Sequence, residues 1–340
     1  MAAPGVRTER EIFDPRTSVS CDGALFSLID VAGFSFNKLV IFGVGLIGGS
    51  LARALRERGD VAGARTVIGV GRTPASTARA LELGVIDASA ALADDAALQA
   101  ALSGADFVLL AAPVAQTQPL LERIAPFLDA DTIVTDAGST KSDVVAAARA
   151  ALGERIGQFV PGHPIAGRES SGVDAALPDL YVGRNVVLCA LPENAPAAVE
   201  RVAALWRATG ALVHEMSAGQ HDRVFASVSH LPHLLSFALV EQILNSPDAA
   251  LKFSFAAGGF RDFTRIAASS PEMWRDICVA NRAALLDELD AYTEVLARLR
   301  AAVEAADGAA LEAVFARSRV ARTEWQEQRA PLAAAADPAK

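Results

Sequence analysis

The sequence is poor in cysteine, and the cysteines it has are not arranged for cross-linking. Its 340 residues contain three, Cys21, Cys189 and Cys278, with no Cys-x-x-Cys spacing. An odd and scattered set of thiols forms neither a disulfide framework nor a zinc site. We therefore expect no metal centre, and a chain that works in the reducing cytoplasm.

Long hydrophobic runs and blocks of basic residues are also missing. No apolar run reaches the roughly 18 residues that a membrane span needs, and the start of the chain lacks the order of a signal peptide. The formal net charge is −9, and the lysines and arginines are scattered. A phosphate backbone is bound by clustered basic residues. We expect a soluble protein with neither a nucleic-acid nor a membrane partner.

The length and the apolar content predict two globular units between disordered ends. Residues 1–36 mix charge, Pro and Gly without any period, which is typical of a disordered tail. Met1 is followed by no methionine until Met216. We therefore hypothesise that translation starts at a non-ATG codon near Val31 and that the native protein lacks the tail. Residues 331–340 are expected to form a second disordered tail.

Residues 37–214 alternate short apolar runs with helical patterns. The runs include KLVIFG, TVIGVG, ADFVLLAAP, DTIVTDAG and GQFVPGHP. Strands that alternate with helices predict crossover connections and a Rossmann-type, doubly wound, mostly parallel sheet. The runs are continuously apolar, as expected when helices cover both faces of the sheet. The first unit is therefore α/β.

Residues 215–330 have no strand pattern and predict an all-α unit. Ser269 or Ser270, followed by Pro271, is a strong helix start because the hydroxyl caps a free N–H and proline is tolerated in the first turn. The helices are apolar on more faces than one core needs. We expect the surplus to form the interface of a homodimer.

Three glycines follow the first predicted strand in the pattern G-x-G-x-x-G. Gly43 allows the tight turn, Gly45 lets a pyrophosphate approach the backbone, and Gly48 lets helix and strand pack closely. Leu46 and Ile47 begin the helix whose free N–H groups face the phosphates. The pattern predicts a dinucleotide site. The alternative is a glycine-rich turn kept only for packing.

The end of the second strand bears on which dinucleotide is bound. Sites that prefer NAD carry an acidic residue there for the ribose 2′-OH, whereas this chain has Gly71 followed by Arg72 and Thr73. Arg72 is suited to hold a 2′-phosphate. We therefore favour NADP over NAD. The alternative is that Arg72 is an ordinary surface arginine.

Three loops should meet at the carboxyl edge of the sheet, where open α/β sheets bind ligands. AAPVAQT has small residues that would let a ring lie close, with Pro113 stiffening the turn; TDAGSTKSDV contains Ser139; and FVPGHPIAGRESSGV contains His163 and Glu169. Imidazole titrates near neutrality and accepts a hydroxyl proton as hydride leaves the same carbon. His163 is our candidate base, against the alternative of a structural loop histidine.

The helical unit adds a second polar group in SVSHLPHLLSF. Ser229 and His233 are four residues apart and should share a helix face, with His230 turned away by about 100°. Pro232 is expected to kink the helix. Three polar side chains around a kink predict a site wall, although hydrogen-bonded core histidines would give the same pattern.

Arginine is the residue type that binds a carboxylate with two hydrogen bonds. Arg265 follows Gly258 and Gly259, which we interpret as a loop before a capped helix. It is the candidate for holding a substrate carboxylate. Arg261, Asp262 and Arg275 are expected to form structural or surface ion pairs.

Taken together, the glycine turn, DAGSTK, GHPIAGRESSGVDAA, SHLPH and GGFRDFTRIAASSPEMWRDI resemble the prephenate/arogenate dehydrogenase family of tyrosine biosynthesis. The resemblance covers residues 38–327 in one order. It implies a nicotinamide-dependent oxidative decarboxylation that gives 4-hydroxyphenylpyruvate from prephenate or tyrosine from arogenate. It also implies that His163 polarises the ring 4-hydroxyl with help from Ser139, and that Arg265 holds the carboxylate. The matching residues Ser229, His230, His233 and Glu169 would line the side-chain pocket.

Two other functions remain open at this point. A β-hydroxyacid dehydrogenase or imine reductase of similar plan would use a lysine of the helical half as its acid, and Lys252 is the only lysine between Lys141 and Lys340. A non-catalytic dinucleotide sensor would need no base. The choice between prephenate and arogenate, which differ in a keto and an amino group, also stays open.

Overall fold

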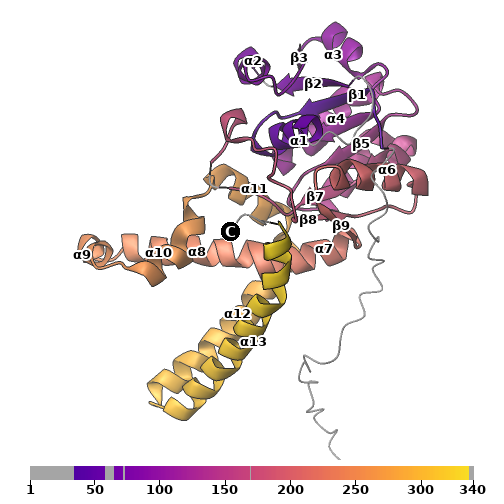
Figure 1. The fold of residues 1–340 in the computed structure, drawn as a ribbon. Coiled ribbons are helices and arrows are strands. Elements are labelled where there is room, and N and C mark those ends of the chain that lie inside the picture. Colours follow the sequence, from indigo (N-terminus) through magenta and orange to yellow (C-terminus); the bar gives the residue numbers. More distant parts are fainter. Residues whose placement is uncertain (1–33, 58–64, 72, 169, 337–340) are drawn as a thin grey trace, which may run out of the picture.

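The computed structural model describes residues 34–57, 65–71, 73–168 and 170–336. An α/β part built around a sheet lies beside a helical part, and two long helices at the carboxyl end extend away from both (Figure 1). The two parts are joined by contacts between helices α5 (Ser142–Leu152) and α7 (Ala218–Phe225). Helix α11 (Pro271–Ala280) also contacts the turn Val114–Gln116.

The main sheet has six parallel strands in the order β3-β2-β1-β4-β5-β6. The strand order changes direction between β1 and β4, which is where such sheets bind ligands. The strands are β1 Lys38–Phe42, β2 Thr66–Gly71, β3 Ala88–Ala91, β4 Phe107–Leu110, β5 Ile133–Asp136 and β6 Phe159–Val160.

Helices cover both faces of this sheet, and the side chains of β1 show why its sequence is apolar throughout. Leu39 and Ile41 join a core with α1 and α6, whereas Val40 and Phe42 join a second core with α3, α4 and α5. Alternate residues of a strand point to opposite faces, so a doubly covered strand has no polar side. The helices are α1 Leu46–Glu57, α2 Pro74–Glu82, α3 Asp95–Leu102, α4 Thr117–Ile124, α5 Ser142–Leu152 and α6 Pro196–Arg207.

A second sheet, which the sequence did not predict, begins where GQFVPGHP was expected to form one strand. The run divides at Pro161 into β6 and β7 Gly162–Pro164. Proline has no N–H for a ladder, and the chain changes sheet there. Strand β7 pairs antiparallel with β8 Asn185–Leu188, and β8 pairs parallel with β9 Leu212–Glu215.

Both ends of the folded part differ from expectation. Phe36 is buried, and its ring lies with those of Phe34 and Phe107 at centroid distances of 6.0–6.4 Å. The predicted disordered tail is therefore wrong for residues 34–36, while residues 1–33 lie outside the described part. At the other end helix α13 continues to Ala336, so the second predicted tail is wrong through that residue, and 337–340 also lie outside the description.

The helical part begins after β9 and continues to the end of the described chain. Ser270 caps α11 through the amide of Met273, with Pro271 in the first turn, as predicted. The helices are α7 Ala218–Phe225, α8 Leu231–Leu244, α9 Ala249–Ser254, α10 Gly258–Thr264, α11 Pro271–Ala280, α12 Arg282–Glu304 and α13 Gly308–Ala336.

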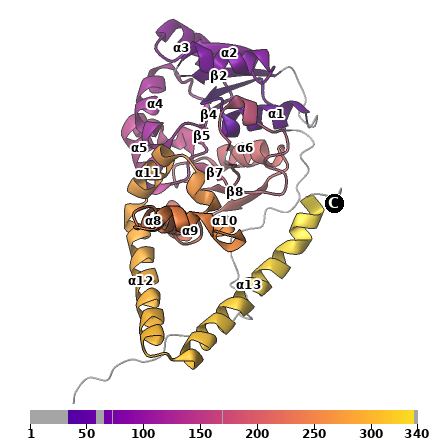
Figure 2. The ribbon, with the colours of Figure 1, turned by 90° about the vertical axis from the view of Figure 1, so that its left-hand side faces the viewer.

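Helices α12 and α13 diverge as a V from the turn that joins them (Figure 2). Over residues 308–328 helix α13 has no buried side chain. Large apolar side chains are exposed across the helical part, including Val228, Phe255, Phe263, Val279, Val303 and Phe315. Helices in proteins gain most of their stability by packing an apolar face against other elements, and exposed apolar surface of this kind is typical of an interaction site.

One continuous stretch, Ala218–Leu244, is long and apolar enough to cross a membrane when judged by length and composition alone. It consists of α7, a π-helical turn Ala226–His230 and α8. The buried side chains of His221, Asp222 and His230 on this stretch hydrogen-bond to other parts of the chain. Such bonds are typical of a core helix in a folded domain.

Candidate active site

Three loops and one short strand meet at the carboxyl edge of the main sheet. A Cβ on Gly43 would lie 2.6 Å from the carbonyl oxygen of Ala111, which follows β4. A Cβ on Gly138, after β5, would lie 3.0 Å from Val114, and the amide of Gly162 donates to Asp136 at 3.0 Å. The glycine turn, the loop with Pro113, the loop with Ser139 and the strand with His163 therefore adjoin one another.

The glycine turn has room for a dinucleotide. Gly43 has φ +97°, which favours glycine, and a Cβ on Gly48 would lie 2.4 Å from the Gly43 carbonyl oxygen. A Cβ on Gly45 would meet nothing within 4 Å. Packing therefore explains the first and third glycines but not the second, whose open surface fits the approach of a pyrophosphate. The amino end of α1, with Leu46 and Ile47, faces the same turn, and the Tyr181 hydroxyl donates to the Ile47 carbonyl at 2.6 Å.

The end of β2 has no space for an acidic side chain. A Cβ on Gly71 would lie 2.3 Å from the hydroxyl oxygen of Ser76, and that hydroxyl donates to the Thr73 carbonyl at 2.7 Å. Thr73 itself caps the amino end of α2. Arg72 lies outside the described residues, so its proposed role stays a prediction. In the loop after β4, Pro113 is the residue directly before the 3-10 turn Val114–Gln116, and its side chain makes no capping hydrogen bond.

His163 is half-buried in β7, not in a loop after a strand as predicted. Its Nδ1 lies 2.8 Å from Nε2 of His221, and Nδ1 of His221 lies 2.8 Å from Oδ1 of Asp222. Burial, then the neighbouring His221, Lys141 and His230, hold the pKa of His163 well below its usual value. The ring is therefore neutral near pH 7, as an acceptor of a proton must be.

Asp222 connects the two parts of the chain. Its carboxylate accepts hydrogen bonds from the backbone amides of Lys141 and Ser142, each at 2.8 Å, at the start of α5. Burial alone would raise the pKa of Asp222, but hydrogen bonds from His221, Ser142 and Lys141 outweigh it and lower this pKa to about 2. The carboxylate thus stays ionised and marks a fixed negative charge beside His221.

A buried ion pair joins the two ends of the loop that contains Ser139. The Lys141 ammonium lies 2.5 Å from Oδ2 of Asp136, and both side chains are almost fully buried. The other oxygen of Asp136 accepts the amide of Gly162, next to His163. A buried charge pair is costly to break because the remaining charge is left unpaired. Asp136 therefore ties the loop with Ser139 to the strand with His163.

His230 lies in the site wall as the last residue of the π-helical turn Ala226–His230. The chain winds more widely in this turn than in the regular helix from which the 100° offset was predicted. Such turns often occur at functional sites. Nδ1 of His230 lies 3.0 Å from the side-chain amide of Asn281, and a hydrogen bond to the backbone of Ser139 also holds the ring. Burial first, then His221, lowers the pKa of His230 to about 4.

His233 and Ser229 lie one turn apart, as predicted. Nδ1 of His233 lies 2.9 Å from the Ser229 carbonyl oxygen, and its ring stacks on Trp274 at a centroid distance of 3.5 Å. The 3-10 turn that begins with Arg265 packs against α8, and the charge of Arg265 adds to burial in lowering the pKa of His233. The expected loop before Arg265 is wrong, because Gly258 and Gly259 open helix α10 and Arg265 begins a 3-10 turn after it.

The structure therefore brings together His163, Ser139, His230 and the wall with His233 and Arg265, while Glu169 lies outside the described residues. Sequence reasoning missed the polar residues that hold these side chains: Asp136, Lys141, His221, Asp222, Trp274 and Asn281. One signal was available. The pair His221–Asp222 lies shortly after the cap Ser217, in a helix that continues into the long apolar stretch ending at Leu244.

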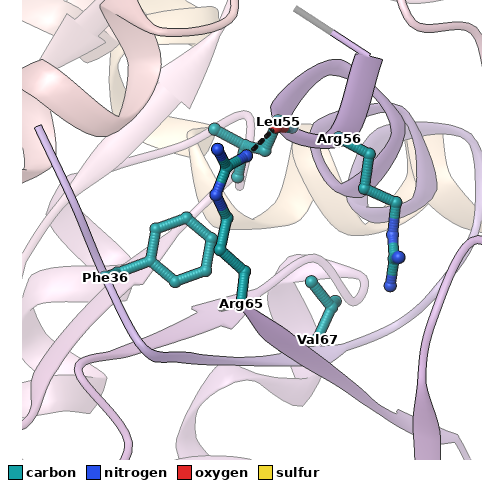
Figure 3. A pocket seen from close by; sticks show the side chains of 5 residues that line it. All are labelled: Phe36, Leu55, Arg56, Arg65 and Val67. Carbon is teal, nitrogen blue, oxygen red and sulfur yellow. Dashed lines mark hydrogen bonds between the residues drawn. The ribbon is translucent and has the colours of Figure 1, made fainter. Parts of the chain in front are cut away.

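A separate pocket of about 300 Å³ lies at the opposite, amino-terminal edge of the sheet. Figure 3 shows its lining by Phe36, Leu55, Arg56, Arg65 and Val67. Arg65 donates to the Leu55 carbonyl, and Arg56 pairs with Asp87 at 2.7 Å. These arginines thus have protein partners, and the loops with His163 and the glycine turn lie elsewhere.

The chain matches two family models in succession. Residues 51–215 match the nucleotide-binding domain of prephenate dehydrogenase, and residues 217–317 match the prephenate dehydrogenase dimerization domain. A prephenate dehydrogenase of Bacillus subtilis is 38% identical over 80% of this chain and 71% of its own length. The chain belongs to the prephenate dehydrogenase family.

Other members of this family are similar over most of their length. A cyclohexadienyl dehydrogenase of Zymomonas mobilis is 36% identical over 84% of this chain and 95% of its own. The solved structure of an Aquifex aeolicus prephenate dehydrogenase, in complex with hydroxyphenyl propionate and NAD+, superposes with a TM-score of 0.79, 35% identity and coverage of 86% and 99% of the two chains. A Synechocystis arogenate dehydrogenase gives a TM-score of 0.70 at 28% identity, covering 85% and 99%.

The two glycines of the turn should separate folding from cofactor binding. Gly48→Ala places a methyl group against the Gly43 carbonyl, and we expect overpacking to cost about 1–3 kcal/mol of stability. Gly45→Ala meets open space, so its melting temperature should stay unchanged while the affinity for the dinucleotide falls. Calorimetric unfolding and dinucleotide titration measure the two effects. Equal affinity in wild type and Gly45→Ala would contradict the placement of the pyrophosphate.

Burial of neutral His230 predicts a loss of stability in mild acid. The unfolded chain takes up this proton near the ordinary pKa of 6.5, whereas the folded chain does so only at about 4. Stability from this residue is thus fully present above pH 6.5 and is lost as the pH falls toward 4. Between pH 7 and 5 the expected loss is about 2 kcal/mol. Denaturant unfolding at both pH values should show a smaller loss in His230→Gln, and an identical loss would refute the assignment.

Proposed function

We propose that this protein oxidises and decarboxylates prephenate or arogenate with a nicotinamide dinucleotide, and that His163 accepts the proton of the ring hydroxyl. The observation that carries this proposal is the position of His163. It is a neutral, half-buried imidazole in β7 whose neighbouring strand end and loops adjoin the glycine turn. The family membership supports the same reaction.

The bound nicotinamide would supply the acceptor for the hydride that leaves ring carbon 4. The residues of this chain then have to position the ring, take up one proton and exclude water. His163 accepts the proton from the 4-hydroxyl as the carbonyl develops, and Ser139 assists with its hydroxyl. Loss of carbon dioxide from ring carbon 1 restores aromaticity, so no protein group has to supply a further electron acceptor.

The helical part would bind the rest of the substrate. Arg265 holds a substrate carboxylate through its planar guanidinium, and the stacked pair of His233 and Trp274 forms a flat wall beside it. Ser229, His230 and Glu169 complete the side-chain pocket in this proposal. Arogenate, which carries an amino group in place of the keto group, is served by the same wall, so both substrates are candidates.

For the cofactor we propose a preference for NADP over NAD. The contact between a Cβ at position 71 and Ser76 supports this choice, because it leaves no place for the carboxylate that binds a free ribose 2′-OH. Arg72 follows directly in the sequence and would neutralise a 2′-phosphate. The capping hydroxyl of Thr73 is a further donor at the amino end of α2.

We also propose a homodimer formed through the helical part. The match of residues 217–317 to a dimerization domain supports it, and the exposed apolar side chains of α8 to α13 are the surface that would be covered. Cytoplasmic location remains a prediction from the cysteine content.

His163→Asn tests the reaction. Wild type should turn over at least one of the two substrates, and the variant should lose at least about 100-fold in kcat because a general base typically contributes this much. Dinucleotide affinity should stay unchanged, which titration checks. The measurement is a matrix of steady-state rates with both substrates and both cofactors. No turnover in any wild-type combination would favour a dinucleotide sensor, and full activity in the variant would remove His163 from the mechanism.

Gly71→Asp tests the cofactor proposal when it is combined with Ser76→Ala and Thr77→Ser, which remove the two side-chain atoms that would lie within 3.0 Å of the new Cβ. A carboxylate at this strand end repels a 2′-phosphate, so kcat/KM with NADP should fall at least about tenfold. The same value with NAD should hold or rise. Ser76→Ala with Thr77→Ser, without the change at Gly71, is the matched control. A wild type that prefers NAD would overturn the proposed preference outright.

A further inference from the structure

The hydrogen bonds around Asp222 determine where the protons sit on two histidines. The Asp222 carboxylate is ionised and lies 2.8 Å from Nδ1 of His221. Because a carboxylate only accepts, Nδ1 of His221 must carry a hydrogen. A neutral His221 then has its lone pair on Nε2.

The same reasoning continues to His163. Nε2 of His221 lies 2.8 Å from Nδ1 of His163, so the lone pair on the first nitrogen requires a hydrogen on the second. The neutral His163 ring therefore has its lone pair on Nε2. Through two rings, Asp222 leaves this nitrogen free to accept a proton from substrate.

We propose that His221 is the second member of a proton relay that ends at Asp222. This inference rests on the proposed function of His163. As the substrate O–H bond breaks, a new N–H bond forms at Nε2 of His163. The hydrogen on its Nδ1 passes to Nε2 of His221, and the resulting imidazolium lies beside the Asp222 carboxylate. The electron pair of the C4–H bond leaves with the hydride, so the proton transfers involve no change of oxidation state in the protein.

The charges around the two rings favour this transfer. Burial lowers the pKa of both rings, but for His163 the remaining neighbours His221, Lys141 and His230 lower it further. For His221 a hydrogen bond to Asp222, with smaller contributions from Asp222 and Asp136, opposes burial and the charge of Lys141. A positive charge is therefore better placed on His221, which is fully buried next to its counterion.

The tautomers can be measured directly in the protein without substrate or cofactor. The chain has five histidines, so nitrogen-15 NMR of histidine-labelled protein is tractable, with single His→Gln variants for assignment. We expect both His163 and His221 to carry hydrogen on Nδ1 at neutral pH. A hydrogen on Nε2 of His163 would overturn the relay, because that nitrogen then could not accept a proton.

Activity provides the second test through His221→Gln. A glutamine oxygen can still accept from His163, but it cannot take the proton onward. We expect kcat to fall about 10- to 100-fold, with the KM values for substrate and cofactor little changed. The matched control is His214→Gln on β9, whose ring contacts Asn185 outside the site and whose loss should change neither constant.

The pH profile separates a relay from a merely structural role. In wild type the first proton taken up at low pH sits on His221, which then blocks the accepting form of His163. In His221→Gln only His163 can take up the proton, and burial, Lys141 and His230 but no longer His221 then set its pKa, so the acid limb of kcat/KM should move. An unmoved acid limb with reduced kcat would show that His221 only supports the fold. If the glutamine variant unfolds, the NMR tautomers of wild type alone decide.

The two hypotheses fail in different ways. If His163→Asn keeps full turnover, the proposed function of His163 fails and the relay fails with it. If His163→Asn is inactive while His221→Gln has wild-type kcat and an unchanged acid limb, only the relay fails. A loss in both variants, together with Nδ1–H on both rings, supports the complete relay.

Discussion

The Asp222 carboxylate is the group on which the geometry of the site depends. It accepts the amides of Lys141 and Ser142, which are free donors at the start of α5, and it also holds His221. One side chain of the helical part thus satisfies the end of a helix in the α/β part. Because those amides are buried, losing the carboxylate would leave them without partners. The contact therefore sets how the two parts meet, and the site lies at that meeting.

The charges near His163 are arranged to keep it neutral until substrate binds. Lys141 is buried close by, but its charge is balanced by Asp136, and Asp136 also holds the amide of Gly162. Asp222 balances a charge that arises on His221. The site therefore contains two acidic side chains with separate partners. Asp136 pairs with Lys141, and Asp222 pairs with His221.

The dehydrogenase site also shows how an irregular backbone contributes to chemistry. The π-helical turn Ala226–His230 directs His230 toward Asn281 and the Ser139 loop, while His233 stays one turn further on the wall with Trp274. Stacking on Trp274 and the bond to the Ser229 carbonyl fix the second ring, so the wall is ordered by the protein itself.

The sequence by itself determined the α/β half, the helical half and the glycine turn, because these depend on local patterns: continuous apolar runs, helical spacing of apolar residues, and glycines between a strand and a helix. The pattern Gly162-His163-Pro164 also singled out His163, whose role stays a prediction. Only the tertiary structure decided the break at Pro161, the packing of Phe34 and Phe36, and the partners His221, Asp222 and Asn281. Those contacts join residues about 50 to 80 positions apart, and no periodicity of 2 or 3.6 residues records such a pairing. The π-helical turn was not predicted either, because its wider winding departs from the 3.6-residue period by which helices are predicted.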